Sequence, residues 1–163
     1  MIPSKLAGSS KFHSAHGNGI ADVTCPPPEW ALDISSGVPA MDRLHHDIFS
    51  ALDALSGSDD TAFCEEFTTF VRRVERAFRE EEAWMDELDF QEMAAHQEQH
   101  ARLLGALHHI HAQVMGGDVG IGRHVVDELL PQWLLVHIST LDTSFAGAIQ
   151  FARSEGALFL QPS

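Results

Sequence analysis

The chain has 163 residues, of which 44% are hydrophobic, and this is enough for one domain with a buried core. Its formal net charge of −14 argues against binding to nucleic acid or to an anionic membrane surface. No apolar run approaches the roughly 20 residues that span a bilayer, and the first residues lack the apolar segment of a signal peptide, so we expect a cytoplasmic protein.

Residues 1–29 differ in composition from the rest of the chain. They contain few large apolar side chains and end in CPPPE, whose three prolines forbid a helix. We interpret this segment as an extended, partly disordered N-terminal arm. Trp30 is the first large apolar anchor, so the folded domain is expected to cover residues 30–155, followed by a C-terminal tail at residues 156–163.

Apolar side chains then recur at alternating spacings of four and three residues, a pattern that predicts amphipathic helices. The first helix is expected from about Pro39 to Leu55 and the second from about Asp60 to Leu88. The second helix follows SGSDD, where Ser58 or Asp59 can act as its N-cap.

The third helix is expected to follow a short turn. Asp89 and Glu92 have the spacing of a capping box for its start. Its end is predicted near Met115, where Gly116 and Gly117 stop the helix.

The fourth helix has a less regular pattern. Asp118 can cap it, and Pro131 should kink it or begin it afresh because proline lacks a backbone donor. Beyond the proline the predicted inward positions are Trp133, His137, Leu141, Ser144 and Ala148. Four helices with short joins and no strand alternation predict an all-α, up-down-up-down four-helix bundle.

Each predicted helix carries side chains of the metal-ligand type on its inward side. Along the chain these residues are His45, Glu81, His96, His100, His137 and Asp142. A buried carboxylate without a partner costs several kcal/mol. Because imidazoles lie alongside, a metal is the expected partner.

The spacing of these residues bears on the number and kind of metal. His96 and His100 form an HxxxH pair, which places two imidazoles on one helical face. His137 and Asp142 would lie about 140° apart around a regular helix, which is poor for holding one ion but suits a carboxylate that bridges two. The whole set exceeds the four ligands of tetrahedral zinc and suits two six-coordinate ions, for which iron is appropriate.

The segments WALDISSGVPAMDRLH, FREEEAWM, HQEQH and WLLVHISTLD follow one another in this chain. In this order and spacing they resemble bacterial hemerythrins, and the resemblance covers Trp30 to about Phe151. It implies a non-haem di-iron site inside a four-helix bundle, bridged by Glu81, Asp142 and an oxo or hydroxo oxygen. It further implies that His45 serves the oxygen-binding iron. The imidazoles of the other iron would be His96, His100 and His137.

One position departs from the family pattern. The family carries HFxxEE on the second helix, with a His four residues before the bridging Glu81, whereas this chain has Ala77 at that place. The oxygen-binding iron would keep His45 as its only imidazole. It should therefore carry an open coordination position, filled by water, an anion or another residue.

Other protein groups are alternatives for that position. Glu80 and Glu82 lie about 100° to either side of Glu81 on a helix, so we expect them to be solvated. His13 and His16 on the arm are further alternatives, although nothing in the sequence requires them.

Three functions stay open from the sequence. The leading one is a di-iron protein that binds molecular oxygen or small anions as a carrier, store or sensor. The alternative is a di-iron enzyme with peroxidase, oxidase or nitric-oxide chemistry, and the third is a structural or signalling bundle with incomplete or substitute metal loading. The apolar tail GALFLQPS packs either against the bundle end or against another subunit, and the latter would give a weak homo-oligomer.

Overall fold

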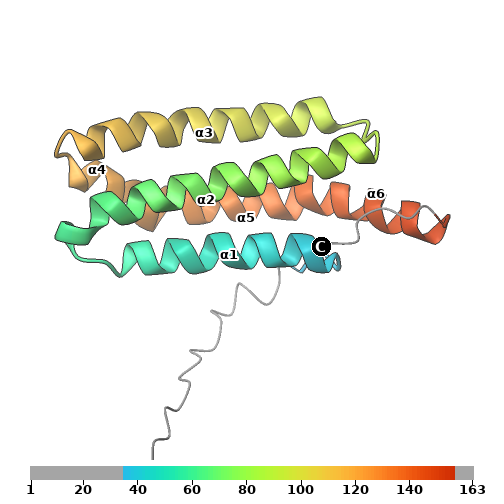
Figure 1. Cartoon of the computed structure of the whole chain (residues 1–163), viewed down its shortest axis with the longest axis horizontal. Helices are drawn as coiled ribbons and strands as arrows, with labels where there is room; N and C mark the ends of the chain where they lie inside the picture. Colours follow the sequence, from blue (N-terminus) through green and yellow to red (C-terminus); the bar gives the residue numbers. More distant parts are fainter. Residues whose placement is uncertain (1–34, 157–163) are drawn as a thin grey trace, which may run out of the picture.

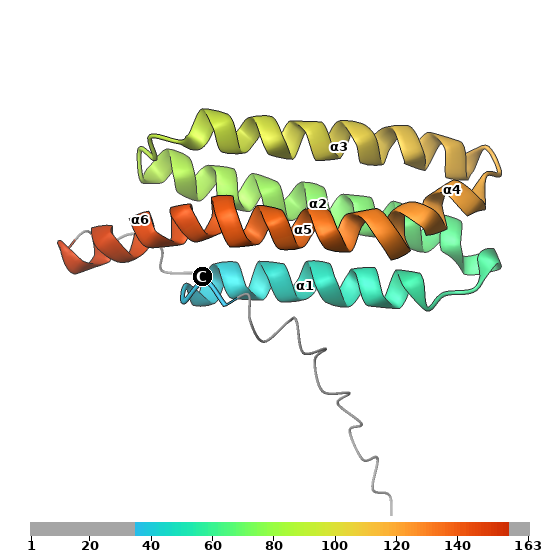
Figure 2. The ribbon, with the colours of Figure 1, turned by 180° about the vertical axis from the view of Figure 1, so that it is seen from behind.

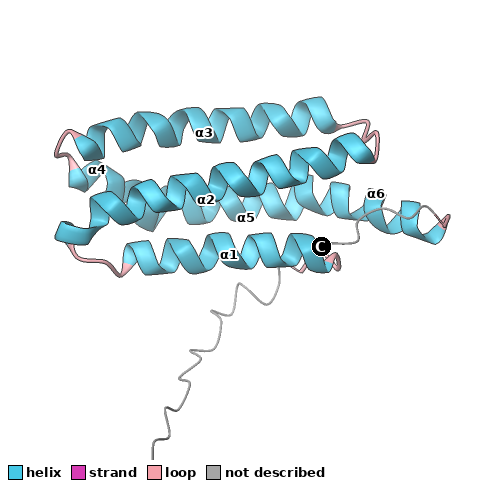
Figure 3. Ribbon diagram, in the orientation of Figure 1, coloured by secondary structure: helices cyan, strands magenta, loops and turns pink. Residues whose placement is uncertain are grey.

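The structure is a computed structural model that describes residues 35–156. Within this range all regular structure is helical, and short loops join the helices (Figure 3). Four helical rods lie side by side and antiparallel (Figures 1 and 2), which confirms the predicted all-α, up-down-up-down bundle. The predicted arm at residues 1–29, Trp30 and residues 157–163 of the tail lie outside the described residues.

The first three rods are single α-helices that match the predicted ranges closely. They are α1 (Pro39–Ser56), α2 (Asp60–Glu87) and α3 (Met93–Met115). Asp59 caps α2, since its carboxylate accepts hydrogen bonds from the backbone N–H groups of Thr61 and Ala62. Along α1 every predicted inward position is buried, namely Met41, His45, Ile48, Leu52 and Leu55.

The capping box predicted at the start of the third helix is wrong. Asp89 has a φ of 51° and lies in the turn after α2, where its N–H donates to the carbonyl of Asp86 at 3.1 Å. Glu92 occupies the N-cap position itself and makes no side-chain cap bond. Its carboxylate instead accepts a hydrogen bond from the Ser144 hydroxyl at 2.9 Å, which ties this turn to the fourth rod.

The fourth rod is continuous but changes its helical pitch twice. It consists of α4 (Val119–His124), η2 (Val125–Leu129), α5 (Leu130–His137), η3 (Ile138–Asp142) and α6 (Thr143–Ser154). The two η segments are π-helical, so hydrogen bonds span five residues, as in the bond from the Thr143 N–H to the Ile138 carbonyl. Asp118 caps the rod as predicted, and Pro131 falls in the first turn of α5.

The π-helical turn of η3 overturns part of the predicted core of the fourth rod. The periodicity predicted three inward positions in the part of the rod that follows His137, namely Leu141, Ser144 and Ala148. These side chains are half-buried or exposed. The buried side chains there are Asp142, Phe145 and Ile149. Each lies one residue later than predicted, because a π turn takes up one more residue than an α turn.

The bundle core has two parts. A large apolar cluster is formed by residues such as Phe63, Phe67, Phe70 and Leu107. A smaller cluster around Met85 and Phe145 lies at the end where α2 turns into α3. No helix within the described range is long and apolar enough to cross a membrane.

Candidate metal centre

All six predicted site residues lie together in the interior of the bundle. His45 comes from α1, Glu81 from α2, His96 and His100 from α3, and the fourth rod adds His137 and Asp142. Each is at most 4% exposed. Five of them, all except His45, offer ligand atoms that lie within 4.8 Å of one another.

Three imidazoles form one end of the site. The Nε2 atom of His137 lies 3.1 Å from Nε2 of His96 and 3.2 Å from Nε2 of His100. Metal–imidazole bonds of about 2.1 Å set at right angles would place neighbouring ligand nitrogens roughly 3.0 Å apart. The three nitrogens are therefore spaced as ligands of one ion would be.

Hydrogen bonds alone cannot pair all of these closely spaced ring nitrogens. A neutral imidazole nitrogen either donates one hydrogen bond or accepts one. Nε2 of His137 faces two other nitrogens and also Oδ1 of Asp142 at 3.2 Å. A central cation would accept the lone pairs of all three rings and remove this conflict, so the donor set fits a metal.

The carboxylate of Asp142 lies between the two ends of the site. Its Oδ1 is 3.0 Å from Nε2 of His96, and its Oδ2 is 3.0 Å from Nε2 of His45. The predicted separation of about 140° between His137 and Asp142 is corrected by η3, where residues five apart lie on one face. Their ligand atoms are accordingly neighbours.

Glu81 faces the site from the opposite wall. Its Oε2 lies 3.3 Å from Nε2 of His100, and its Oε1 lies 3.7 Å from Nε2 of His45. Although they contact ring nitrogens, Oε2 of Glu81 and Oδ1 of Asp142 lack a hydrogen bond of acceptable geometry. Buried oxygens that face ring nitrogens without hydrogen bonding to them fit a set of ligands arranged around a central ion.

The pKa values of the two carboxylates are shifted in opposite directions. Burial, and then repulsion by Asp142, raise the pKa of Glu81 well above its ordinary value. Burial acts in the same direction on Asp142, but the contacts with His137, His45 and His96 outweigh it and hold the pKa of Asp142 well below its ordinary value. Without a metal, this places the shared proton on Glu81 and the negative charge on Asp142.

The pKa values of three of the imidazoles are also shifted in different directions. Burial lowers the pKa of His100 and of His137, which favours the neutral form that binds metals. Burial also acts to lower the pKa of His45, but the hydrogen bond and charge of Asp142 outweigh it and raise that pKa. His45 is therefore the imidazole that must release a proton before it can serve as a ligand.

Glu82 takes part in the site, contrary to the prediction that it is solvated. Its side chain is only 30% exposed, and its Oε1 accepts a hydrogen bond from Nδ1 of His100 at 3.0 Å. This bond leaves the lone pair of His100 on Nε2, which faces the other ligands. The feature of the sequence that could have indicated this role is that Glu82 directly follows Glu81 on α2. Its side chain therefore lies next to the inward face of that helix, on the side of α3.

Aromatic rings hold two of the imidazoles in place. The ring of Phe78 stacks on His100 with centroids 3.7 Å apart and an interplanar angle of 5°. Trp133 stacks on His137 at 4.6 Å. Beside that pair a cavity of about 320 Å³ reaches His137 between α3 and the fourth rod, and Gln99 and Thr140 also line it.

Ala77 is buried on α2, one helical turn before Glu81. Glu80 is solvated as predicted and pairs with Arg76 at 3.7 Å. Among residues 35–156, no acidic or histidine side chain other than those named joins the ligand cluster. His13 and His16 lie outside the described residues, so their predicted alternative role stays a prediction.

The amino-acid sequence of the chain is similar to that of a known protein. It is 28% identical over 117 residues to a bacteriohemerythrin of Ralstonia nicotianae, and the aligned part covers 72% of this chain and 85% of that protein. No family model matches the chain, and no solved structure matches it.

This similarity agrees with the fold and with the buried cluster of His, Glu and Asp. The chain is therefore a hemerythrin-like helical bundle with a candidate metal site, and it is distantly homologous to bacteriohemerythrin.

Proposed function

We propose that this chain is a non-haem di-iron protein that binds molecular oxygen and small anions. The observation that carries the proposal is the convergence of three Nε2 atoms on one side of Asp142 and of a fourth on its other side. The similarity to a bacteriohemerythrin supports iron as the metal.

The residues divide naturally between two ions. His96, His100 and His137 would hold one iron. His45 would hold the other, and Glu81 and Asp142 would contact both. Two divalent ions would also balance two buried carboxylates, since no Lys or Arg of the described chain pairs with either one.

The protein groups around the site have defined tasks. Bound ferrous ions would supply the redox chemistry that oxygen binding requires. Glu82 holds the ring of His100 in one tautomer, and Phe78 and Trp133 fix two ring planes. Burial of all six residues excludes bulk water, which would favour reversible binding of oxygen over its release in a reduced form with oxidation of the iron.

A second function, a di-iron enzyme, is favoured by one residue. The methyl group of Ala77 replaces an imidazole beside the iron held by His45, and in our proposal this leaves a coordination position for solvent, an anion or a substrate. Carboxylate-containing di-iron bundles with fewer histidines carry out oxidative chemistry.

The deciding experiment is iron quantification after anaerobic purification, followed by an oxygen titration monitored in the near-ultraviolet and visible. Two irons per chain and a reversible spectral change on oxygen addition and removal would support the oxygen-binding function. Two irons with turnover of an added reductant would favour the enzyme, and absence of iron would refute both.

A further inference from the structure

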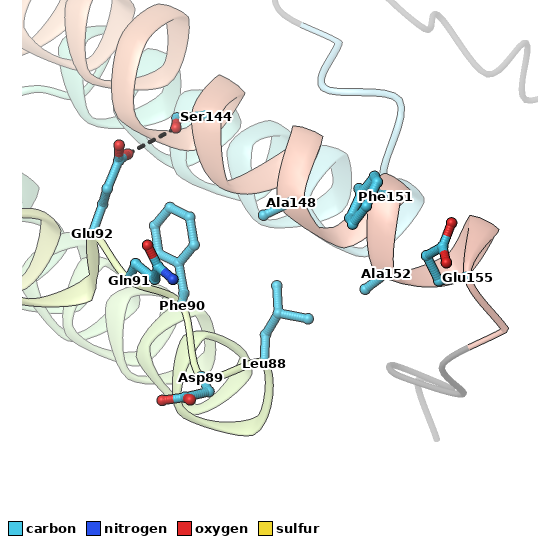
Figure 4. A pocket seen from close by; sticks show the side chains of 10 residues that line it. All are labelled: Leu88, Asp89, Phe90, Gln91, Glu92, Ser144, Ala148, Phe151, Ala152 and Glu155. Atoms are coloured by element: carbon cyan, nitrogen blue, oxygen red, sulfur yellow. Dashed lines mark hydrogen bonds between the residues drawn. The ribbon is translucent and has the colours of Figure 1, made fainter.

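A groove of about 520 Å³ lies at the end of the bundle, between the α2–α3 turn and α6 (Figure 4). Apolar side chains form half of its lining, and the other half is polar or acidic. Leu88 and Phe90 line it on the side of the turn, and Ala148, Phe151 and Ala152 line it on the side of α6. The groove is separate from the metal centre, although the ring of Phe90 packs on Phe145 at 5.1 Å.

Most side chains in the last turns of α6 are exposed to solvent. α6 projects past the turn between α2 and α3 (Figures 1 and 2). Phe151 is 68% exposed, the highest value for a large hydrophobic side chain in the described range. An exposed aromatic ring beside an apolar hollow is typical of a surface that another segment covers.

The last residue described after α6, Gly156, has a backbone conformation that is typical of a chain reversal. Gly156 has a φ of +79°, and its N–H donates to the carbonyl of Arg153 at 3.1 Å. These are features of a Schellman motif, in which the residue after the glycine contacts the helix three to four residues before the cap. With Glu155 as the cap, the contacted positions are Ala152 and Phe151, and both line the groove.

The residues that follow have the composition and length to fill the groove. They read ALFLQPS, with three consecutive large apolar side chains at positions 158–160 and no charged side chain. The groove runs along α6 from Glu155 to Ser144, which is about 16 Å at 1.5 Å per residue. Four extended residues span about 13 Å.

We infer that residues 157–160 fold back antiparallel to α6 and dock in this groove, with Leu158, Phe159 and Leu160 as the anchoring side chains. The segment carries no charge that the acidic rim of Asp89, Glu92 and Glu155 would repel or attract. Apolar burial is therefore the driving force, and docking should be insensitive to salt.

The direct test is amide hydrogen exchange on the full-length protein. The variant Leu158→Ser/Phe159→Ser/Leu160→Ser is compared with the control Gln161→Ser/Pro162→Ser, which changes the same tail outside the apolar run. We expect the triple variant to lose about tenfold in protection at amides 148–155 and 88–92, and the control to match the wild type. Equal protection in all three proteins would overturn the inference.

The reversal at Gly156 provides a second, independent test. A Cβ at this position meets nothing within 4 Å, so only the positive φ restricts the residue type. Gly156→Ala disfavours the reversal, whereas Gly156→Asn tolerates it. Protection should fall in the Ala variant and largely persist in the Asn variant, and the opposite ranking would contradict docking by reversal.

Two other occupants are separated by the same measurement. A segment exchanged between two copies would make protection rise with protein concentration together with the dimer fraction measured by light scattering. Docking of the N-terminal arm would make protection depend on residues 1–29 and not on the tail. Either result would overturn the inference, and concentration-independent protection that needs residues 158–160 supports it.

Discussion

The two ends of the candidate metal centre differ in how many imidazoles they contain and in how firmly those imidazoles are held. At one end Nε2 of His137 lies within 3.2 Å of Nε2 of both His96 and His100. Stacked rings and Glu82 fix the orientations of His100 and His137. At the other end His45 is the only imidazole, and its pKa is raised by the carboxylate that it contacts.

The difference indicates that a buried site can be preorganised on one side and adaptable on the other. The crowded end presents three nitrogens in place before a metal arrives, and burial lowers the pKa of His100 and of His137, which favours their neutral, metal-binding form. The sparse end must first give up a proton and then relies on Asp142 and Glu81 to complete its shell. We therefore expect the crowded end to bind metal first and more tightly, and each experiment below challenges that ordering.

The largest effect is expected from His137→Ala. This change removes the nitrogen that neighbours both other imidazoles of the crowded end and also opens a cavity beside Asp142. Iron content should fall from about two per chain to near zero, because the sparse end lacks the ligands to hold an ion alone. The matched control is His108→Ala, an exposed residue that should keep full iron. Retention of one tightly bound iron by the His137 variant would reverse the proposed ordering.

His45→Ala should remove only half of the metal. The three-imidazole end keeps all its nitrogens, and Asp142 keeps its contacts with His96 and His137. We expect about one iron per chain by elemental analysis, with an unchanged helical circular dichroism spectrum. Complete loss of iron would show that the two ions bind as one cooperative unit.

Glu82→Gln tests how the crowded end is preorganised. A glutamine keeps the size of the side chain but weakens the hydrogen bond that holds the proton on Nδ1 of His100. Loss of an outer partner of this kind typically lowers metal affinity about 10- to 100-fold. Competition with a chelator measures the change, and Glu80→Gln on the solvated neighbour is the control. An affinity equal to that of the control would mean that Phe78 stacking alone positions the ring.

Ala77→His would make the sparse end resemble the crowded one. An added imidazole one turn before Glu81 is expected to occupy the open coordination position. Azide affinity should fall severalfold, and the oxygenated form should last longer before autoxidation, because fewer positions admit water or anions. Unchanged azide binding and lifetime would indicate that the position is already filled by a protein group.

The metal-free protein is expected to lose stability as the pH rises. Since the pKa of Glu81 is raised in the folded state, folding retains a proton that the unfolded chain releases near its ordinary value of 4.5. The free energy of unfolding then falls as pH rises above that value, by up to about 1.4 kcal/mol per pH unit. Glu81→Gln carries no such proton, so its metal-free form should gain stability over the wild type as the pH rises above about 4.5. Parallel melting curves across that range would show that Glu81 is ionised in the metal-free fold.

The regular helices were predictable because nothing interrupts their pattern. Along α1, His45 lies in register with Met41 and Ile48, and the same periodicity places Glu81 on the inward face of α2. The periodicity failed in the fourth rod, where Phe145 and Ile149 are buried in place of Ser144 and Ala148. A π turn leaves no clear signature in residue type, so the shift of one residue became evident only from the backbone hydrogen bonds.

The role of Glu82 was missed for a different reason. Helical geometry correctly placed it beside the inward face of α2, but its partner comes from α3. The angular position of α3 relative to α2 is a property of the packed bundle. No spacing within one segment reports it, whereas the HxxxH pair and the Asp59 cap are local and were predicted directly.

The π turn between His137 and Asp142 limits how this centre can be transplanted or trimmed. A protein designer who copies the pair onto a straight scaffold helix must recode it from five residues apart to four, or the carboxylate will face away from the imidazole. Conversely, a substitution that imposed regular α-helical pitch on Ile138–Asp142 while keeping all five residues would rotate everything beyond the segment by about 100°. Phe145 and Ile149 would then leave the core together with Asp142, so the burial of all three side chains depends on the π-helical pitch of this segment.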